Sequence, residues 1–129
     1  MFRKILVPVD LAEPQIAEKA LTIAKRLAKM DGAEILLISV TPEPQTPTDE
    51  GMLEAQLQAL VDREGEGLKM DGVLNIGGTV ATEVRRAAEE FRCDLVVMAS
   101  HWPRIDDYLF GSRSASVALH STCSVLVVR

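Results

Sequence analysis

Short aliphatic runs alternate along the chain with stretches in which apolar residues recur every three or four positions. An unbroken aliphatic run of four to eight residues is typical of a strand that is buried on both faces of a sheet. Such runs occur at Ile5–Asp10, Glu34–Val40, Asp94–Ala99 and Val125–Val128. A shorter and weaker run, Val73–Ile76, ends at two glycines. The pattern therefore predicts five strands.

The intervening stretches have helical periodicity. Apolar residues at helical spacing from Ile16 to Leu27 predict an amphipathic helix, opened near Pro14 and closed around Asp31 and Gly32. Leu53, Leu57, Leu60 and Val61 predict a second helix, which we expect to fray near Gly65 and Gly67. Thr79 is a plausible N-cap for a third helix that carries Val80, Val84, Ala87, Ala88 and Phe91 inward.

Two segments are predicted to be loops. Thr41–Thr48 contains three prolines, which favour irregular structure. Ser100–Phe110 follows the fourth strand and is unusually long for a connection within a compact domain. A last helix is expected from Gly111-Ser112 to about Leu119.

Strands that alternate with helices predict an α/β domain built from βαβ units. We expect a doubly wound, five-stranded, mostly parallel sheet with helices on both faces, a Rossmann-like arrangement. The 129 residues suffice for one domain, and residues 1–129 show no linker or internal repeat. Aromatic residues make up only 4% of the chain, so the core must be aliphatic.

Charge and composition exclude several classes of function. The formal net charge of -5 argues against nucleic acid as a partner, because nucleic-acid binders carry a basic face. No apolar run approaches the roughly 20 residues of a membrane span, and the first strand pattern follows Met1 without a signal-peptide segment. We expect a cytoplasmic protein with no membrane partner. Cys93 and Cys123 stand in no metal-binding spacing, and no metal site is predicted.

Any small ligand should lie at the carboxyl ends of the strands, where the strand order of an open parallel sheet reverses. Three segments end at that edge: Pro8–Asp10, Val40–Thr41 and Met98–Ser112. The last one ends in Gly-Ser at a predicted helix start, an arrangement that suits a phosphate group. Many such pairs are plain helix caps, and that alternative stays open.

Several of these segments resemble the universal stress protein family (UspA-like). The resemblance rests on Lys4-Ile-Leu-Val-Pro-Val-Asp10, on Asp94-Leu-Val-Val-Met-Ala-Ser-His101, on Leu109-Phe-Gly-Ser112 and on Cys123-Ser-Val-Leu-Val-Val-Arg129, and it extends along the whole chain in element order. It implies the fold type called adenine nucleotide alpha hydrolase-like, a role in a stress response, and homodimers that meet through Val125–Val128. An exposed edge strand favours such pairing, and an edge covered by a loop is the alternative.

The family contains ATP-binding and non-binding members, and the binders resemble a Gly-X2-Gly-X9-Gly-Ser/Thr pattern. Ala99 and Trp102 stand where this pattern has its first two glycines, while Gly111 and Ser112 match it. Eight residues rather than nine separate Trp102 from Gly111. The turn His101-Trp-Pro and the short loop resemble most the members with a His-X-Pro turn.

The resemblance implies ATP, with or without magnesium, as the ligand. It places Asp10 near the ribose or a phosphate-bound metal, and the backbone of Val9 and Val40 against the adenine. The remaining residues of the expected site are Pro8, Met98, Ala99, His101, Trp102, Gly111, Ser112 and Arg113.

The same side chains have plainer explanations. The Trp102 ring has three possible roles. It fills and closes the pocket, or it covers the ligand and stacks on its base, or it serves only in packing or at an interface. Asp10 can cap the first helix or a turn before it. Arg104 and Arg113 either balance phosphate charge or pair at the surface with residues such as Asp106 and Asp107. His101 is as compatible with a turn as with a ligand contact.

No catalytic residue is predicted. The sequence has no phosphate-binding loop with Gly-Lys-Ser/Thr and no nucleophile elbow, and its two histidines, His101 and His120, form no triad. A phosphorelay receiver is excluded, because the first strand ends in a single aspartate and the third in Asn75-Ile-Gly-Gly. Three hypotheses result: a nucleotide-binding regulatory dimer, a non-binding dimeric scaffold closed by Trp102, and a weak ATPase.

Overall fold

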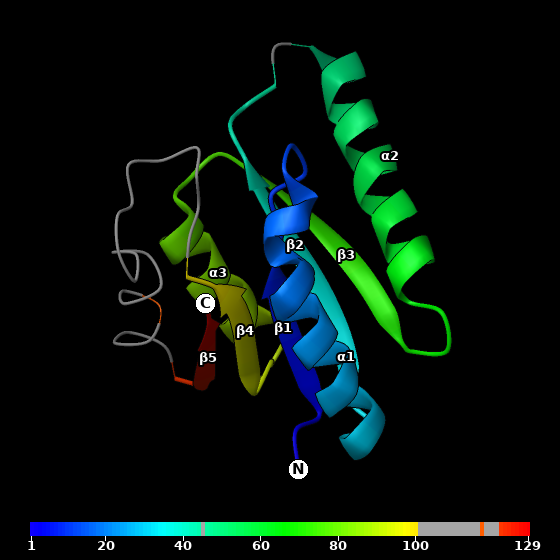
Figure 1. The fold of residues 1–129 in the computed structure, drawn as a ribbon. Coiled ribbons are helices and arrows are strands. Elements are labelled where there is room, and N and C mark those ends of the chain that lie inside the picture. Colours follow the sequence, from blue (N-terminus) through cyan, green and yellow to red (C-terminus); the bar gives the residue numbers. More distant parts are fainter. Residues whose placement is uncertain (45, 101–116, 118–121) are drawn as a thin grey trace.

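The computed structural model of the chain describes residues 1–44, 46–100, 117 and 122–129. Figure 1 shows a sheet flanked by helices. The elements are β1 (Lys4–Pro8), the 3-10 helix η1 (Pro14–Ala17), α1 (Glu18–Asp31), β2 (Glu34–Thr41), α2 (Pro47–Glu64), β3 (Met70–Ile76), α3 (Val80–Glu90), β4 (Leu95–Ala99) and β5 (Ser124–Val128).

The five strands form one sheet in the order β3-β2-β1-β4-β5. All four pairings are parallel, from Ile35↔Met70 at one side to Ala99↔Val128 at the other. This confirms the doubly wound α/β fold. The strand order reverses at β1: β2 and β3 follow on one side of it, and β4 and β5 are then added on its other side. All carboxyl ends therefore meet at one edge, which lies at the top of Figure 1.

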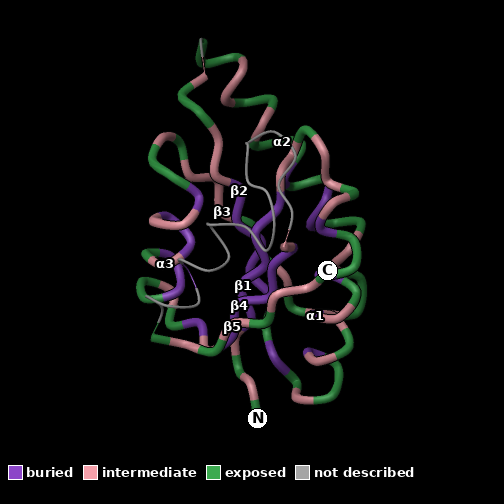
Figure 2. The backbone as a smooth tube through the Cα atoms, turned by 60° about the vertical axis from the view of Figure 1, so that its left-hand side comes forward, coloured by how far each residue is buried: buried purple, intermediate pink, exposed green. Residues whose placement is uncertain are grey.

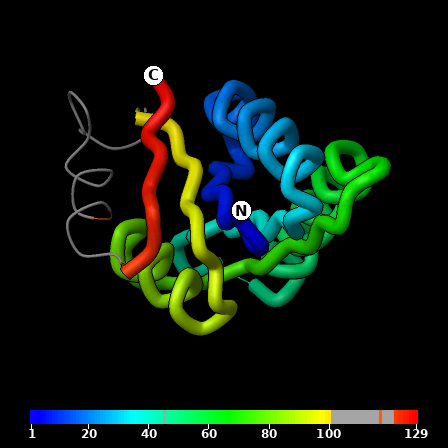
Figure 3. Tube along the Cα trace, turned by 90° about the horizontal axis from the view of Figure 1, so that it is seen from below, coloured from blue at the N-terminus to red at the C-terminus, as the bar shows by residue number. Residues whose placement is uncertain are grey.

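Alternate residues of the central strands pack into two separate apolar layers. Ile5 and Val7 of β1 face the layer formed with α1 and α2. Leu6 faces the opposite layer, which contains residues of α3 together with Val117. The buried segments are concentrated in the central strands (Figure 2), and the view along the sheet shows helices on both of its faces (Figure 3). Burial on both faces explains why these strands are continuous aliphatic runs.

Helix ends lie where the sequence places turn and capping residues. α1 ends at Gly32, whose φ of 69° is a left-handed conformation that glycine adopts without steric cost. Thr79 caps α3 as predicted, since its side chain accepts a hydrogen bond from the backbone N–H of Thr82. The predicted first helix differs at its beginning: Pro14–Ala17 is a separate 3-10 turn, and the α-helix starts at Glu18.

The prediction of a loop over Thr41–Thr48 was wrong at both ends. Thr41 pairs with Ile76 as the last residue of β2, and α2 already begins at Pro47. The Thr46 side chain accepts a hydrogen bond from the Asp49 N–H at 3.1 Å, and the Asp49 carboxylate accepts one from the Thr46 N–H at 3.1 Å. This capping box starts the helix, and proline is favoured at the first helical position because it needs no hydrogen-bond partner there.

Other boundaries differ by a few residues. β3 begins at Met70 rather than Val73, because pairing with β2 from Ile35 onward recruits the polar residues before the apolar run. β1 ends at Pro8, two residues before Asp10. The loop predicted at Ser100–Phe110 and the helix predicted from Gly111 to Leu119 lie outside the described residues, except for Ser100 and Val117. Val117 is helical and fully buried. Among the described residues, no helix is long and apolar enough to cross a membrane.

Candidate functional site

An open cavity of about 760 Å³ lies at the carboxyl ends of β1 and β2. The turn after β1 forms one wall, the segment after β2 forms the rim, and the N-terminal half of α2 forms the opposite wall. The lining residues are Asp10, Leu11, Ala12, Val40, Thr41, Pro42, Glu43, Pro44, Asp49, Met52, Leu53, Gln56 and Val80. Its volume falls in the range of small-molecule sites, which bury most of their ligand against apolar walls.

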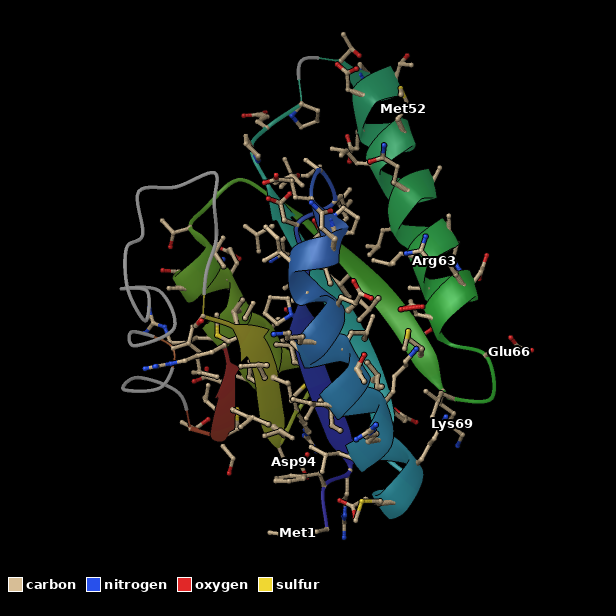
Figure 4. The ribbon with its side chains drawn as sticks, in the orientation of Figure 1. Met1, Met52, Arg63, Glu66, Lys69 and Asp94 are labelled. Atoms are coloured by element: carbon tan, nitrogen blue, oxygen red, sulfur yellow. The ribbon has the colours of Figure 1, made fainter. Side chains whose placement is uncertain are left out.

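The wall formed by α2 exists because this helix extends past the carboxyl ends of the strands (Figure 1). Its buried residues, Leu57, Leu60 and Val61, all belong to the second half of the helix. The first half rises above the strand ends in Figure 1, and Met52 lies high on it in Figure 4. Met52 is 58% exposed although it is apolar. The overhanging turns therefore present Met52 and Leu53 to the cavity rather than to the core.

Asp10 lies in the turn directly after β1 and lines the cavity. Its Oδ1 atom accepts a hydrogen bond from the Ala12 N–H at 3.0 Å, and its carbonyl accepts one from the Glu13 N–H at 3.1 Å. The carboxylate thus stabilises the turn that leads into η1, which is the structural role weighed for it from the sequence. This role fixes the carboxylate at the cavity wall, so it is compatible with a ligand contact.

Of the site residues expected from the sequence, the structure brings Asp10 and Val40 together around the cavity. Pro8, Met98 and Ala99 are buried in strands and Val9 is buried directly after β1, and none of the four is among the described lining residues. The Val9 N–H donates to the Ile38 carbonyl at 2.8 Å and is therefore used within the sheet. His101, Trp102, Gly111, Ser112 and Arg113 lie outside the described residues, and their roles stay predictions.

The described lining comes from the end of β2, from the segments after β1 and β2 and from α2. Val80, at the start of α3, adds a described residue from the other face of the sheet. The sequence analysis did not place the residues of the α2 wall, Asp49, Met52 and Gln56, at the site. It also placed the start of this helix too late, although the start was signalled by Thr46-Pro-Thr-Asp49, a capping box before an apolar stripe.

Acidic groups are the only charged side chains among the described lining residues: Asp10, Glu43 and Asp49. Asp49 is used in the capping box of α2. In the part of the chain that the structure describes, no three His, Cys, Asp or Glu side chains group closely enough to hold a metal ion.

The sequence profile of the universal stress protein family matches residues 1–129. The chain belongs to the universal stress protein family. Universal stress protein G of Shigella flexneri is 32% identical over 143 aligned positions that cover all of both chains.

Solved structures share the fold of this universal stress protein. A universal stress protein in complex with cAMP is 21% identical with a TM-score of 0.77, covering 99% of this chain and 97% of that chain. The universal stress protein from Archaeoglobus fulgidus in complex with dAMP is 20% identical with a TM-score of 0.73, covering 98% of each chain. At these identities the likeness establishes the α/β fold of the chain.

Proposed function

We propose that this universal stress protein binds an adenine nucleotide, whose adenosine part occupies the cavity between the turn after β1 and the overhanging half of α2. The observation that carries the proposal is the position of the cavity. It opens at the carboxyl ends of parallel strands, between two loops and a helix, which is where doubly wound folds bind nucleotides. The protein would have a regulatory role in a stress response, in which a partner recognises whether the ligand is bound.

The lining suits a base and a ribose. Val40, Leu53 and Met52 offer apolar surface for a flat ring, and the Asp10 carboxylate offers acceptors for hydroxyl donors. The family resemblance names ATP, and two fold relatives are described with cAMP and dAMP. Adenine and a ribose are common to ATP and cAMP, and the proposal is for this adenosine part. ATP itself, magnesium and the cytoplasmic location stay predictions.

A pair of substitutions on α2 tests the site. Gln56 and Gln58 are both exposed on this helix, but only Gln56 lines the cavity. The Gln56→Trp ring should fill the cavity and weaken adenosine binding at least about tenfold in calorimetry, whereas Gln58→Trp should bind like the parent. Equal affinities in the two variants would place the ligand elsewhere. If the parent protein gives no heat of binding with adenosine, AMP, cAMP or ATP, the hypothesis of a non-binding dimeric scaffold is favoured instead.

The contribution of the Asp10 carboxylate to ligand binding is tested with a variant that preserves the turn after β1. Asp10→Asn retains an oxygen for the Ala12 N–H and removes the charge. If the carboxylate accepts a ribose hydroxyl, affinity for adenosine should fall about three- to tenfold, and affinity for free adenine should not change. Adenine binding that falls equally would indicate a damaged turn instead.

The weak ATPase and the closed scaffold are separated from this proposal by two measurements. Trp102 is the chain's one tryptophan, and its fluorescence should change saturably when ATP and magnesium are added if the loop responds to the ligand. Hydrolysis of ATP at the rate of buffer, unchanged in Asp10→Ala, would exclude the ATPase. Binding without turnover is the outcome that the proposal of a regulatory binding protein expects.

The proposal includes a homodimer through β5. In the described part of the sheet β5 pairs with β4 alone, and Leu126 on it is 38% exposed. Apolar side chains on an edge strand favour pairing with a second copy, because both the backbone groups and the side chains are then removed from water.

A further inference from the structure

Among the described residues, two hydroxyl groups near the carboxyl end of β2 are buried without a hydrogen-bond partner. They are Oγ of Ser39 and Oγ1 of Thr41. Buried polar side-chain atoms nearly always have a partner, because an unpaired one has lost its hydrogen bonds to water and gained nothing in exchange. Two such groups, two residues apart on one strand, therefore need an explanation.

The two hydroxyls differ in their relation to the cavity. Thr41 is one of its lining residues, whereas the fully buried Ser39 is not among the described ones. Leu37 of β2 faces the layer formed with α1 and α2, and side chains alternate along a strand, so Thr41 faces the same layer. Val40 packs against the opposite layer. The Thr41 side chain therefore lies on the side of β2 that α2 covers, where the overhanging half of this helix forms the cavity wall (Figure 1).

The backbone of Thr41 is already used in the sheet. Thr41 pairs with Ile76 of β3, and its carbonyl accepts a hydrogen bond from the Gly77 N–H at 2.8 Å. The hydroxyl is thus the polar group of this residue that is left for a ligand. A threonine side chain has staggered positions that differ by a rotation about the Cα–Cβ bond, so Oγ1 can turn toward the cavity without any movement of the strand.

We propose that the Thr41 hydroxyl forms a hydrogen bond with the edge of the purine base in the adenosine site. This inference rests on the proposed function, in which Val40, Leu53 and Met52 offer the apolar surface for the flat ring. Thr41 follows Val40 in the chain and faces the helix that carries the other two. A hydroxyl both donates and accepts, so it can pair with a ring nitrogen or with the exocyclic amino group of adenine.

The unpaired hydroxyl gives this role a signature that a packing role lacks. A ligand that pairs with Oγ1 removes the cost of burying this atom alone. Thr41→Val removes the hydroxyl and keeps the β-branched shape that suits a strand, so the melting temperature of the ligand-free protein should stay the same or rise. Affinity for the ligand should fall at the same time. A side chain that only supports the fold would lose stability and affinity together.

The test compares Thr41→Val, Thr41→Ser and Ser39→Ala by calorimetry with adenosine and with free adenine. Thr41→Val should weaken both ligands by the same factor of about three to ten, which corresponds to one hydrogen bond. Thr41→Ser should bind within about twofold of the parent, because it keeps the donor and acceptor. Ser39→Ala removes the other unpaired hydroxyl and should leave both affinities unchanged. The pattern is distinct from that of Asp10→Asn, which should affect adenosine but not adenine.

Each contrary result has its own meaning. Unchanged affinities in Thr41→Val overturn the role of the hydroxyl while the site itself stands. Equal losses in Thr41→Val and Thr41→Ser assign the effect to side-chain shape and overturn it as well. A loss confined to adenosine moves the contact to the ribose, and a lower melting temperature of ligand-free Thr41→Val makes the residue structural; both overturn the contact with the base. Failure of the parent to bind adenosine and adenine overturns this inference together with the proposed function.

Discussion

Asn75 at the end of β3 donates a hydrogen bond from Nδ2 to Oε2 of Glu83 in the first turn of α3, at 2.9 Å. Glu83 is 8% exposed, and its second partner is Arg86, with Nη1 3.2 Å from Oε1. The pair joins the outermost strand to the helix on the other side of the Gly77-Gly78 turn. A carboxylate that is buried to this extent needs its partners, because an unsatisfied charged group in the interior is costly.

Asn75→Ala should therefore lower the free energy of unfolding by about 1 to 3 kcal/mol. Gln58→Ala is the matched control, since it removes the hydrogen bond at 2.8 Å between the exposed Gln58 and Asp62 side chains. An exposed pair at this spacing on a helix contributes only about 0.2 to 0.5 kcal/mol. Denaturant unfolding measures both. Equal losses in the two variants would show that burial of Glu83 does not set the cost.

Substitutions at Gly77 and Gly78 distinguish the stability cost of backbone strain from that of steric crowding in the same turn. Both have a left-handed backbone, with φ of 81° and 76°. A Cβ on Gly77 would meet nothing within 4 Å, whereas one on Gly78 would lie 2.5 Å from Glu83 Oε1. Gly77→Ala should cost about 1 to 2 kcal/mol from backbone strain. Gly78→Ala should cost about 1 to 3 kcal/mol more, because Glu83 must leave its place.

A double-mutant cycle with Glu83→Ala tests this explanation. In the Glu83→Ala background the penalty of Gly78→Ala should fall to that of Gly77→Ala, since the crowding atom is gone. Additive effects of the two substitutions would contradict the contact.

The sequence predicted the fold from signals that are local. Strand runs with both faces aliphatic, Gly32 after α1 and Thr79 before α3 each act within a few residues, and the structure confirms them. The start of α2 was missed because Pro47 was read as a helix breaker, although proline suits the first helical turn.

The site was harder to predict for a physical reason. Asp10 and Val40 could be placed at the carboxyl edge from strand order alone. The wall with Met52 and Gln56 depends on how far α2 extends past the sheet, and that distance is set by helix packing against β3 rather than by any residue pattern. The length of an overhang is a tertiary property, so a sequence pattern supplies the helix but not its position over the cavity.

The capping box at the start of α2 should stabilise the overhanging wall. Thr46→Ala removes the acceptor for the Asp49 N–H and should lower the free energy of unfolding by about 1 kcal/mol. Thr48 is also exposed, two residues further along, and its side chain makes no hydrogen bond with the described residues, so Thr48→Ala should change the free energy of unfolding by only a few tenths of a kcal/mol. Amide exchange in the first turn of α2 should accelerate in Thr46→Ala alone. Unaltered exchange there would mean that the helix start is held by other contacts.

Dimerisation through β5 is tested by a charge at Val127. Val127→Asp should yield a monomer in light scattering, because an unpaired charge on a self-pairing strand is desolvated in both copies. Leu126→Lys, at a more exposed position on the same strand, is the second variant and carries less risk to folding. Circular dichroism checks that each variant is folded. A folded Leu126→Lys protein with the mass of the parent dimer would count against pairing through this strand.

The raised pKa of the Cys93 thiol predicts that the protein loses stability in alkaline solution. Burial raises the pKa of this thiol from 9.0 to about 11. In the unfolded chain the thiol loses its proton near pH 9, whereas the folded protein keeps it until about pH 11. Between these values the folded state binds more protons, so the free energy of unfolding falls as the pH rises. Below pH 9 both states are protonated and Cys93 makes no pH-dependent contribution. Two pKa units correspond to at most about 3 kcal/mol.

Cys93→Ala isolates this contribution from the lysines and the tyrosine that titrate in the same range. The difference in unfolding free energy between parent and variant should be constant from pH 6 to pH 8 and should then shrink or change sign by pH 11. Cys123→Ala is the comparison, because Cys123 is only partly buried. Alkylation gives an independent readout: at pH 8 Cys93 should react far more slowly than Cys123, since the thiolate is the reacting form. Equal alkylation rates in the folded protein would mean that Cys93 is more exposed to solvent than the structure places it.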